Sequence, residues 1–483
     1  MQKSTRFLVF LIVISIFFSC SKEYEVPSDV VVHDFVWKGL NAYYLHQDQI
    51  NDLSDRRFNS DEELNTYLRS FPDYNTLFSS LLINTDNKST LVEDYNTLIN
   101  PVPRSGFTNG IEFGIIADPG STEDVIGYVT HILPNSNASN QSIIRGEYFN
   151  AVDGIQLTRA NYEDLLINGV DSFTLTMIDF DGTTINTNGK TVTLQKENYN
   201  YPEIYLEKII PNNGENIGYL IYNNDFSENY LTTLNNSALN FKNQGVKKLI
   251  FDLRYNIGSD GFASNIEKIG SMFTGQFANQ IFIKEQWNSK AQPWFLSNQP
   301  DSLLNKFSTN LNETTIINGI ELTDVYIILN GISFTGSSAV ELLINSLRSH
   351  INVHIIGSQT TGNNTGSITL YDSEDYDFEL RRTDHTVALQ PIVLSFLNKD
   401  DQTYENGFSP NIDLCNQEDV LNLGVLGENS DPILNNVLNY ISSGSTTVPN
   451  CNPNNFEYLY NSINQQRIID RGVFIKQDLP NTN

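Results

Sequence analysis

The sequence predicts a multidomain α+β protein, with a helical N-terminal region, a β-rich middle region and a larger α/β region. Three observations support this prediction. Apolar residues recur at helical spacing over 33–100, and short alternating runs bounded by turn residues fill 105–198. From 203 to 442, predicted strands alternate with predicted helices. The 483 residues are enough for two or three domains, each with its own core.

The extreme N-terminus has the pattern of an export signal. Lys3 and Arg6 precede a run at 7–18 that is apolar apart from Ser15. This run is too short to span a bilayer and is typical of the central part of a signal peptide. We therefore expect residues 1–19 to be removed from the mature protein.

Cys20 directly follows this segment. The sequence Phe-Phe-Ser-Cys at 17–20 resembles a relaxed lipobox, which implies that Cys20 is lipidated and becomes the first residue of an exported lipoprotein. Residues 20–32 would then tether the fold to the outer membrane, on its periplasmic face or at the cell surface. An ordinary signal peptide followed by an incidental cysteine is the alternative.

Acidic residues outnumber basic ones, 57 to 29, which gives a formal charge of −28. A field of this sign repels phosphate backbones, so nucleic acid is not an expected partner. Cys415 and Cys451 remain after processing and could form a disulfide or stay as free thiols. The sequence holds no CxxC pair and no HExxH motif, so we expect neither a metal site nor a cofactor.

The helical region begins near residue 33. Phe35, Val36 and Leu40 recur at helical spacing, and Ser60 precedes the acidic residues 61–63 as an N-cap does. We predict a small helical cap domain over 33–100.

The region 105–198 changes to period-two patterns. Strands are predicted at 113–116, 126–130, 148–152 and 173–177. A small β domain is therefore expected between the cap and the α/β region.

Two motifs in this β domain resemble those of PDZ domains. Arg-Gly-Glu-Tyr-Phe-Asn-Ala-Val-Asp-Gly at 145–154 resembles their Arg-Gly-Asp-x-Ile-x-x-Ile-Asp-Gly hairpin, and residues 110–114 stand where such domains carry a carboxylate-binding loop. The resemblance implies that peptide or protein C-terminal tails are the partners, held by backbone N–H groups. The loop residues are Gly110, Ile111, Glu112, Phe113 and Gly114. A small barrel without a ligand is the alternative.

The region 203–442 has a βαβ rhythm, which predicts a mostly parallel sheet covered by helices. Predicted strands lie at 217–222, 246–253, 325–329 and 353–356, with one helix at 230–243 and another after 329 that runs through Arg348. The tail at 443–483 is polar, with Val473, Phe474 and Ile475 expected to pack back on the fold.

Three segments of the α/β region resemble signatures of the S41 peptidases, the C-terminal-processing or tail-specific serine peptidases. They are Asp-Leu-Arg-Tyr-Asn-Ile-Gly at 252–258, Gly-Ser-Ser-Ala-Val-Glu-Leu at 336–342 and Gly-Ser-Gln-Thr-Thr-Gly-Asn-Asn-Thr-Gly-Ser at 357–367. Segments 389–393 and 405–410 agree as well. The resemblance covers nearly the whole mature chain in the same order and implies a crotonase-like ββα peptidase core.

The resemblance places Ser338 on the family's nucleophile. It lies in a Gly/Ser loop at the start of a predicted amphipathic helix, where free N–H groups and the positive end of the helix dipole can stabilise an oxyanion. The resemblance assigns the N–H groups of Gly258 and Ala339 to that role. Without the resemblance, Ser338 would be interpreted as an N-cap. The α/β-hydrolase elbow is excluded because the second glycine of GxSxG is missing.

The family's catalytic base is a lysine, and at that position this chain has Asn363. An amide cannot accept the serine proton near neutral pH, and the loss of a general base typically costs a factor of about 10²–10⁴ in rate. His385, His354 and His350 are possible substitutes, although each is more often a surface or satisfied histidine.

Two hypotheses follow. In the first, the chain is a serine endopeptidase that reads C-terminal tails and cleaves through a Ser338 acyl-enzyme. In the second, it is a pseudopeptidase that binds tails without cutting them, because Asn363 replaces the lysine. A nutrient- or glycan-binding lipoprotein is a third possibility, which only the export signal supports.

Overall fold

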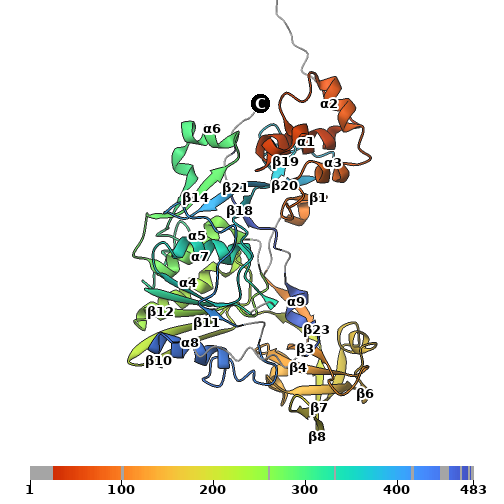
Figure 1. Cartoon of the computed structure of the whole chain (residues 1–483), viewed down its shortest axis with the longest axis vertical. Helices are drawn as coiled ribbons and strands as arrows, with labels where there is room; N and C mark the ends of the chain where they lie inside the picture. Colours follow the sequence, from red (N-terminus) through yellow and green to blue (C-terminus); the bar gives the residue numbers. More distant parts are fainter. Residues whose placement is uncertain are drawn as a thin grey trace, which may run out of the picture.

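The computed structural model describes residues 25–98, 103–258, 261–330, 333–414, 418–445, 456–467, 470–476 and 479. It has the predicted mixed α/β, multidomain fold. Figure 1 shows a helical N-terminal body at one end, an α/β body in the middle and a β-rich body at the other end. In these ranges, no helix has the length and apolar character needed to cross a bilayer. The signal segment 1–19, Cys20, Cys415 and Cys451 lie outside the described residues.

The N-terminal body contains the predicted helices. They are α1 (Val31–Tyr43), α2 (Asp61–Leu68) and α3 (Tyr74–Ser80). The side chain of Ser60 accepts the N–H of Glu63 at 3.3 Å, so the predicted N-cap of α2 is confirmed. The following strand β1 (Thr90–Val92) pairs with β20 (Ala388–Gln390), which joins the helical body to the α/β body.

The β-rich body is a sheet in the order β23-β3-β4-β5-β7-β8, with β6 paired to β5. Its strands are β3 (Ile111–Ala117), β4 (Val125–Ile132), β5 (Tyr148–Val152), β6 (Ile155–Gln156), β7 (Ser172–Phe180), β8 (Ile185–Gln195) and β23 (Tyr458–Asn461). A separate two-stranded ribbon pairs β2 (Ser105–Thr108), which precedes β3 in the chain, with β9 (Glu197–Asn200), which follows β8. Asp153 and Gly154 turn the chain between β5 and β6 with φ of 50° and 78°, as a tight hairpin turn requires.

The main sheet of the α/β body has the order β10-β11-β12-β16-β17-β22. Its strands are β10 (Leu206–Asn212), β11 (Glu215–Ile221), β12 (Lys248–Asp252), β16 (Asp324–Ile328), β17 (Asn352–Gly357) and β22 (Ile412–Asp413). All neighbouring pairs are parallel except β10 with β11, so the predicted parallel sheet is confirmed.

Both faces of this sheet are covered, which explains the continuous apolar runs of its strands. Tyr219 and Ile250 belong to a cluster that includes residues of α8 (Pro432–Ser443). Leu220 and Phe251 belong to another cluster, which includes residues of three helices. Figure 1 shows these helices on the other face of the sheet. These are α4 (Leu231–Asn243), α5 (Ala263–Thr274) and α7 (Ser338–Leu347).

A second sheet has the order β13-β24-β18-β21-β14-β15, and its strand β24 comes from the C-terminal tail. Its strands are β13 (Gly261–Phe262), β24 (Val473–Phe474), β18 (Thr365–Ser367), β21 (Ile392–Leu397), β14 (Ile281–Trp287) and β15 (Leu304–Lys306). Val473 is completely buried. The tail expected to pack back therefore becomes an inner strand of this sheet.

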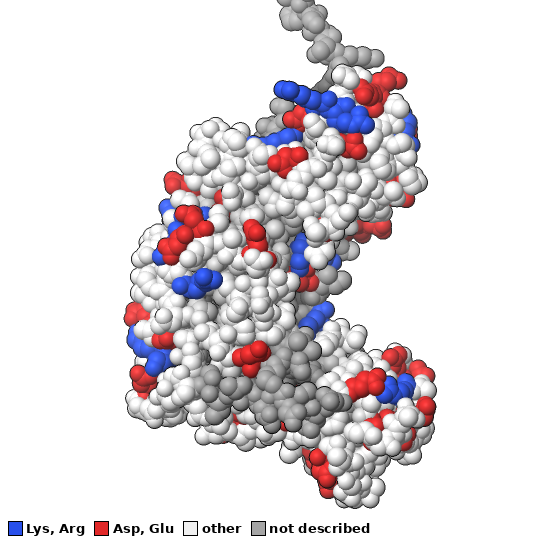
Figure 2. Space-filling model, in the orientation of Figure 1, with Lys and Arg blue, Asp and Glu red and all other residues white. Residues whose placement is uncertain are grey.

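The remaining elements are short. They are α6 (Ala291–Asn298), α9 (Ser462–Gln466), β19 (Leu370–Tyr371), the turns η1 (Gln47–Gln49), η2 (Asn51–Leu53), η3 (Tyr95–Leu98), η4 (Ala138–Asn140), η6 (Glu228–Tyr230) and η7 (Pro300–Leu303), and the π-helical turn η5 (Glu163–Ile167). On the face shown in Figure 2, Lys and Arg are scattered among Asp and Glu, and the surface is hollowed between the α/β body and the β-rich body.

Candidate active site

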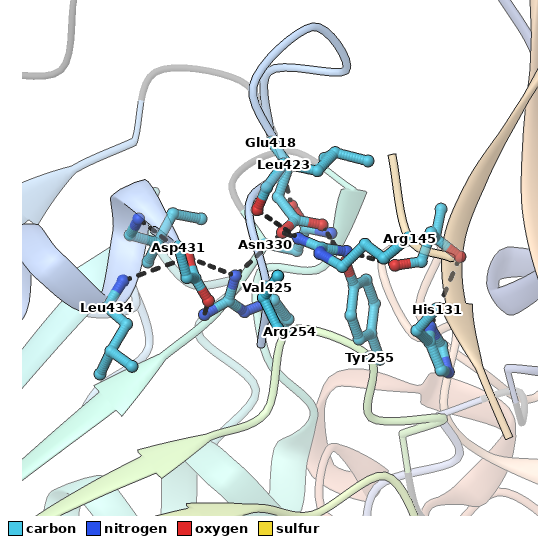
Figure 3. A network of polar contacts seen from close by, with 12 residues as sticks. His131, Arg145, Arg254, Tyr255, Asn330, Glu418, Leu423, Val425, Asp431 and Leu434 are labelled. Carbon is cyan, nitrogen blue, oxygen red and sulfur yellow. Dashed lines mark hydrogen bonds and ion pairs between the residues drawn. The ribbon is translucent and has the colours of Figure 1, made fainter. Parts of the chain in front are cut away.

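A buried ionic cluster holds the segment that follows β12 (Figure 3). Arg254 has no exposed surface, and its guanidinium contacts Asp252 at 2.7 Å, Asp431 at 2.9 Å and Glu418 at 2.9 Å. Asp431 is also the N-cap of α8. The cluster therefore connects the end of β12, a central strand, to the start of α8, which covers one face of the sheet.

The same cluster joins the α/β body to the β-rich body. Arg145, from the hairpin motif, contacts Glu418 at 2.5 Å, and Tyr255 donates its hydroxyl to Glu418. The His131 ring stacks on Tyr255 with their centroids 4.5 Å apart. Burial, with a smaller contribution from the Arg145 charge, lowers the pKa of His131 to about 3, so this histidine is neutral.

Asn256 fixes the turn that leads to Gly258. Its side-chain NH₂ donates to the carbonyls of Tyr222 at 3.2 Å and Asn224 at 2.6 Å, and its Oδ1 accepts the Gly258 N–H at 2.8 Å. Gly258 has a φ of +78°, a conformation that favours glycine. In this structure the N–H predicted to bind an oxyanion is therefore engaged by Asn256.

Ser338 is the first residue of α7 and is completely buried. Ala339 is the second residue, where a backbone N–H has no partner within the helix and the helix dipole is positive. A substrate carbonyl can reach the Ser338 hydroxyl only after neighbouring atoms move.

The Ser338 hydroxyl lies between an amide donor and a carboxylate acceptor. Asn363 Nδ2 donates to Ser338 Oγ at 2.5 Å, and Ser338 Oγ donates to Asp470 Oδ2 at 2.8 Å. The Ser338 backbone N–H donates to the same carboxylate oxygen at 3.1 Å. The expected proximity of Ser338 and Asn363 is present, and Asp470 is an additional neighbour that the sequence motifs did not indicate.

Glu341 holds the loop that carries Asn363. Its carboxylate accepts the backbone N–H groups of Gly362 at 2.6 Å and Asn363 at 2.8 Å. Burial raises the pKa of Glu341. Thr365 donates its hydroxyl to Asn363 Oδ1 at 2.8 Å, so the amide turns its NH₂ group toward the serine. Asn363 is therefore a fixed hydrogen-bond donor to Ser338, at the position where the sequence resemblance implies a base.

Lys88 is the second neighbour that the sequence did not reveal. Its ammonium contacts Asp470 Oδ2 at 3.0 Å and the Asp470 carbonyl at 2.7 Å. Lys88 lies in a polar loop before β1 and has no motif around it. The only sequence signal for Asp470 was the apolar run at 473–475, which showed that the tail packs but not where.

The three histidines considered as substitutes for the base have other partners. His385 contacts Asp372 at 2.9 Å through one ring nitrogen, and its other nitrogen accepts the N–H of Val387. His354 contacts Asp324, and His350 contacts the carbonyl of Ile281. None of these contacts involves Ser338.

The predicted carboxylate-binding residues lie beside the C-terminal segment. Gly110 has a φ of +88°, and residues 111–114 begin β3, along which β23 runs antiparallel. Ser462 Oγ accepts the Phe113 N–H at 3.0 Å and donates to the buried Glu112 at 2.5 Å. Burial raises the pKa of Glu112. The edge that would receive a peptide strand thus carries a strand of the chain itself.

Within the described parts of the chain, no three His, Cys, Asp or Glu side chains are grouped so that they could hold a metal ion. The polar groups described at the site are the Ser338 hydroxyl, the Asp470 carboxylate and the nitrogen donors of Asn363 and Lys88.

Comparisons with known proteins give one family match and a similar fold. Residues 216–414 match the model of Peptidase family S41. The structure is similar to that of a candidate S41 protease from Bacteroides fragilis NCTC 9343, with a TM-score of 0.62 and 19% identity over 88% of this chain and 99% of that chain. No curated protein matches the chain.

Two further structures have lower scores. The photosystem II D1 C-terminal processing protease gives a TM-score of 0.43 at 15% identity over 89% of this chain and 100% of that chain. Mature CPAF gives 0.38 at 12% identity over 87% and 99%. Residues 216–414 thus resemble a Peptidase family S41 domain, and the Bacteroides structure shows that the chain has a similar fold.

The ionic cluster gives a pH-dependent prediction. Burial opposes the ionisation of Glu418, but the charges of Arg145 and Arg254 outweigh it and lower its pKa to about 2, from a usual value of 4.5. The ionised form therefore stabilises the fold above pH 4.5, and this contribution disappears as the pH falls toward 2. We expect Glu418→Gln to lower the free energy of unfolding by about 3 kcal/mol at pH 7.

Chemical denaturation at pH 7 and at pH 3 checks this prediction, and the difference between wild type and variant should shrink at the lower pH. Glu428→Gln is the matched control, because Glu428 pairs with Lys208 at the surface and should contribute less than about 1 kcal/mol. An equal loss in both variants, or a loss from Glu418→Gln that does not depend on pH, would contradict the role of the cluster.

Proposed function

We propose that this chain is an exported, lipid-anchored serine peptidase of the S41 type, which recognises peptide or protein C-terminal tails and hydrolyses peptide bonds through a Ser338 acyl-enzyme. The observation that carries the proposal is the Ser338 hydroxyl, which lies at the N-terminus of α7 and donates a hydrogen bond to a carboxylate. A nucleophile needs such an acceptor within hydrogen-bond reach.

Several features of the site support acyl transfer. Helix α7 directs its N–H groups and its positive dipole end toward the place where an oxyanion would form, with Ala339 as the nearest donor. Gly258 is the proposed second donor, which requires its N–H to turn from Asn256 or to be shared with it. The match of residues 216–414 to the S41 model supports a peptide bond as the substrate.

The lipid anchor and the outer-membrane location rest on sequence alone. The charged and apolar pattern of 1–19 followed by Cys20 supports both. A chain anchored in this way would act on proteins outside the cytoplasm.

Tail recognition is proposed for the loop at 110–114 and the adjoining strand β3. An incoming tail would add to β3 and would have to replace β23, whose C-terminal end points toward the loop, as the end of a bound tail would. The Phe113 N–H, now bonded to Ser462 Oγ, would then be available to a terminal carboxylate.

A pseudopeptidase is the second candidate function. Two observations favour it: Asn363 donates a hydrogen bond to Ser338 in place of a base, and Ser338 is completely buried. Such a protein would bind tails without cleaving them.

Cleavage of unstructured peptides with free apolar C-termini separates the two functions. We expect wild type to cleave them and Ser338→Ala to lose activity by at least about 10³-fold, because the covalent step is lost. In Asn363→Lys, the family's base returns and cleavage should rise. Activity in Asn363→Lys alone, with none in wild type, would establish the pseudopeptidase instead.

Weakening β23 tests the proposed tail site. Tyr460 packs against Phe113 with ring centroids 5.4 Å apart, so Tyr460→Ala should favour release of β23. We expect this change to tighten the binding of a C-terminal peptide several-fold in titration calorimetry, because less of the binding energy is used to displace β23. The same peptide with an amidated C-terminus is the control. Equal affinity for both peptides in both proteins would place recognition elsewhere.

A further inference from the structure

The carboxylate of Asp470 has more donors around it than a surface aspartate needs. Ser338 N, Ser338 Oγ and Lys88 Nζ all lie within hydrogen-bond distance of Oδ2, at 3.1, 2.8 and 3.0 Å. The backbone N–H of Gly472 donates to Oδ1 at 3.1 Å. One carboxylate thus links the nucleophile to a lysine from a distant part of the chain.

The hydroxyl proton of Ser338 points toward this carboxylate. Asn363 Nδ2 donates to Ser338 Oγ from another side, and Asn363 Oδ1 is occupied by Thr365. An amide NH₂ takes up a lone pair of the hydroxyl oxygen and offers no acceptor for its proton. Asn363 as donor and Asp470 as acceptor together fix the direction of the Ser338 hydroxyl, so its proton lies on the bond to Asp470.

Asp470 is held by the core and not by a loose tail. Three residues later, Val473 is completely buried in β24, which lies between β13 and β18. The Ile475 N–H donates to the Ser367 carbonyl at 2.9 Å, which extends the attachment of this strand. A side chain next to a rigid inner strand keeps its geometry, as a catalytic group must.

Lys88 is fixed from the other side. Its backbone N–H donates to Asp86 at 2.9 Å, and its side chain is 16% exposed. Its ammonium contacts both the carboxylate and the carbonyl of Asp470, which restrains the Asp470 side chain and backbone together.

We propose that Asp470 is the general base of Ser338, in place of the lysine that Asn363 replaced, and that Lys88 is a positioning residue for Asp470. This inference rests on the proposed peptidase function. It assigns a catalytic role to the C-terminal segment, which no motif in the sequence marks.

The reaction balances with these groups alone. The bond from Ser338 Oγ to the substrate carbonyl carbon forms as the hydroxyl proton passes to Asp470 Oδ2. The carbon–nitrogen bond then breaks, and Asp470 gives the proton to the leaving amine. Water attacks the resulting ester, Asp470 takes one water proton, and that proton returns to Ser338 Oγ as the acid product leaves.

A purely structural role for Asp470 makes a different prediction. Its carboxylate also accepts the Ser338 N–H, as a cap of α7 would. Asp470→Asn keeps an oxygen that can accept this N–H but removes the basic group. If Asp470 only caps α7, the variant should keep its activity. If Asp470 is the base, the variant should lose activity.

The test uses the full chain and two readouts, peptide cleavage and labelling of Ser338 by a fluorophosphonate probe. We expect Asp470→Asn to lower kcat/KM by about 10²–10⁴-fold. Asp401→Asn is the matched control, since Asp401 pairs with Lys284 at the surface, and it should change the rate by less than about twofold. Lys88→Gln should lower kcat more than it raises KM, and Lys88→Arg should restore part of kcat.

The pH profile identifies the base independently. With a carboxylate base, the acid limb of kcat/KM falls below about pH 5, whereas a histidine base would place it near about 6.5 and a neutral lysine above about 7. In the double variant Asn363→Lys/Asp470→Asn, we expect the acid limb of kcat/KM to move above about pH 7, as for a lysine base.

The outcomes separate the two proposals. If wild type cleaves and Asp470→Asn cleaves equally well, or if the acid limb lies near pH 6.5 or above, the assignment of Asp470 is wrong and the peptidase stands. If wild type does not cleave but its Ser338 is labelled, and labelling slows in Asp470→Asn, the peptidase proposal fails and the base assignment holds. A wild-type chain that neither cleaves nor becomes labelled overturns both.

Discussion

Arg254 has no exposed surface, and much of the architecture follows from the need to compensate its buried charge. Removing a guanidinium from solvent costs several kcal/mol unless carboxylates compensate it closely. Asp252, Glu418 and Asp431 do so from three separate segments. Because Glu418 also pairs with Arg145, the β-rich body is joined to the α/β body through the same charges. The segment that ends in Gly258 is fixed as a consequence.

The nucleophile depends on a second set of constraints. Helix α7 is completely buried, so Ser338 cannot shift without disturbing the core. Glu341, one turn further along the helix, accepts a backbone N–H of the Asn363 loop. Asp470 lies three residues before β24, an inner strand of the second sheet. The backbone around Asn363 and Ser338 is therefore held in place with an amide side chain at position 363. The serine keeps one fixed donor and one fixed acceptor, which is the arrangement that proton transfer requires.

Much of the fold could be predicted from the sequence, because local patterns specify its helices and strands and the order of the motifs specifies part of the site. Ser60 caps α2, helix α4 begins within a residue of the predicted position, and the apolar runs form a parallel sheet. The spacing of the motifs predicted that Ser338 and Asn363 are neighbours, and the two side chains are in contact. Asp470 and Lys88 could not be found in this way. Asp470 is 132 positions from Ser338, and 382 positions separate it from Lys88. The strand β24, folded into the middle of a sheet, places Asp470 beside Ser338, and the pairing of β1 with β20 places Lys88 nearby.

The most direct test of the account is the mass of the intact chain during turnover. A peptide or activated ester would be mixed with the protein, and the reaction would be stopped with acid within the first turnovers. If Ser338 forms an acyl-enzyme, a fraction of chains will be heavier by the mass of the acyl product, with the added group on Ser338, since a covalent intermediate precedes hydrolysis. Cleavage of the substrate with every chain at its unmodified mass, or an acyl group on any other residue, would contradict the account.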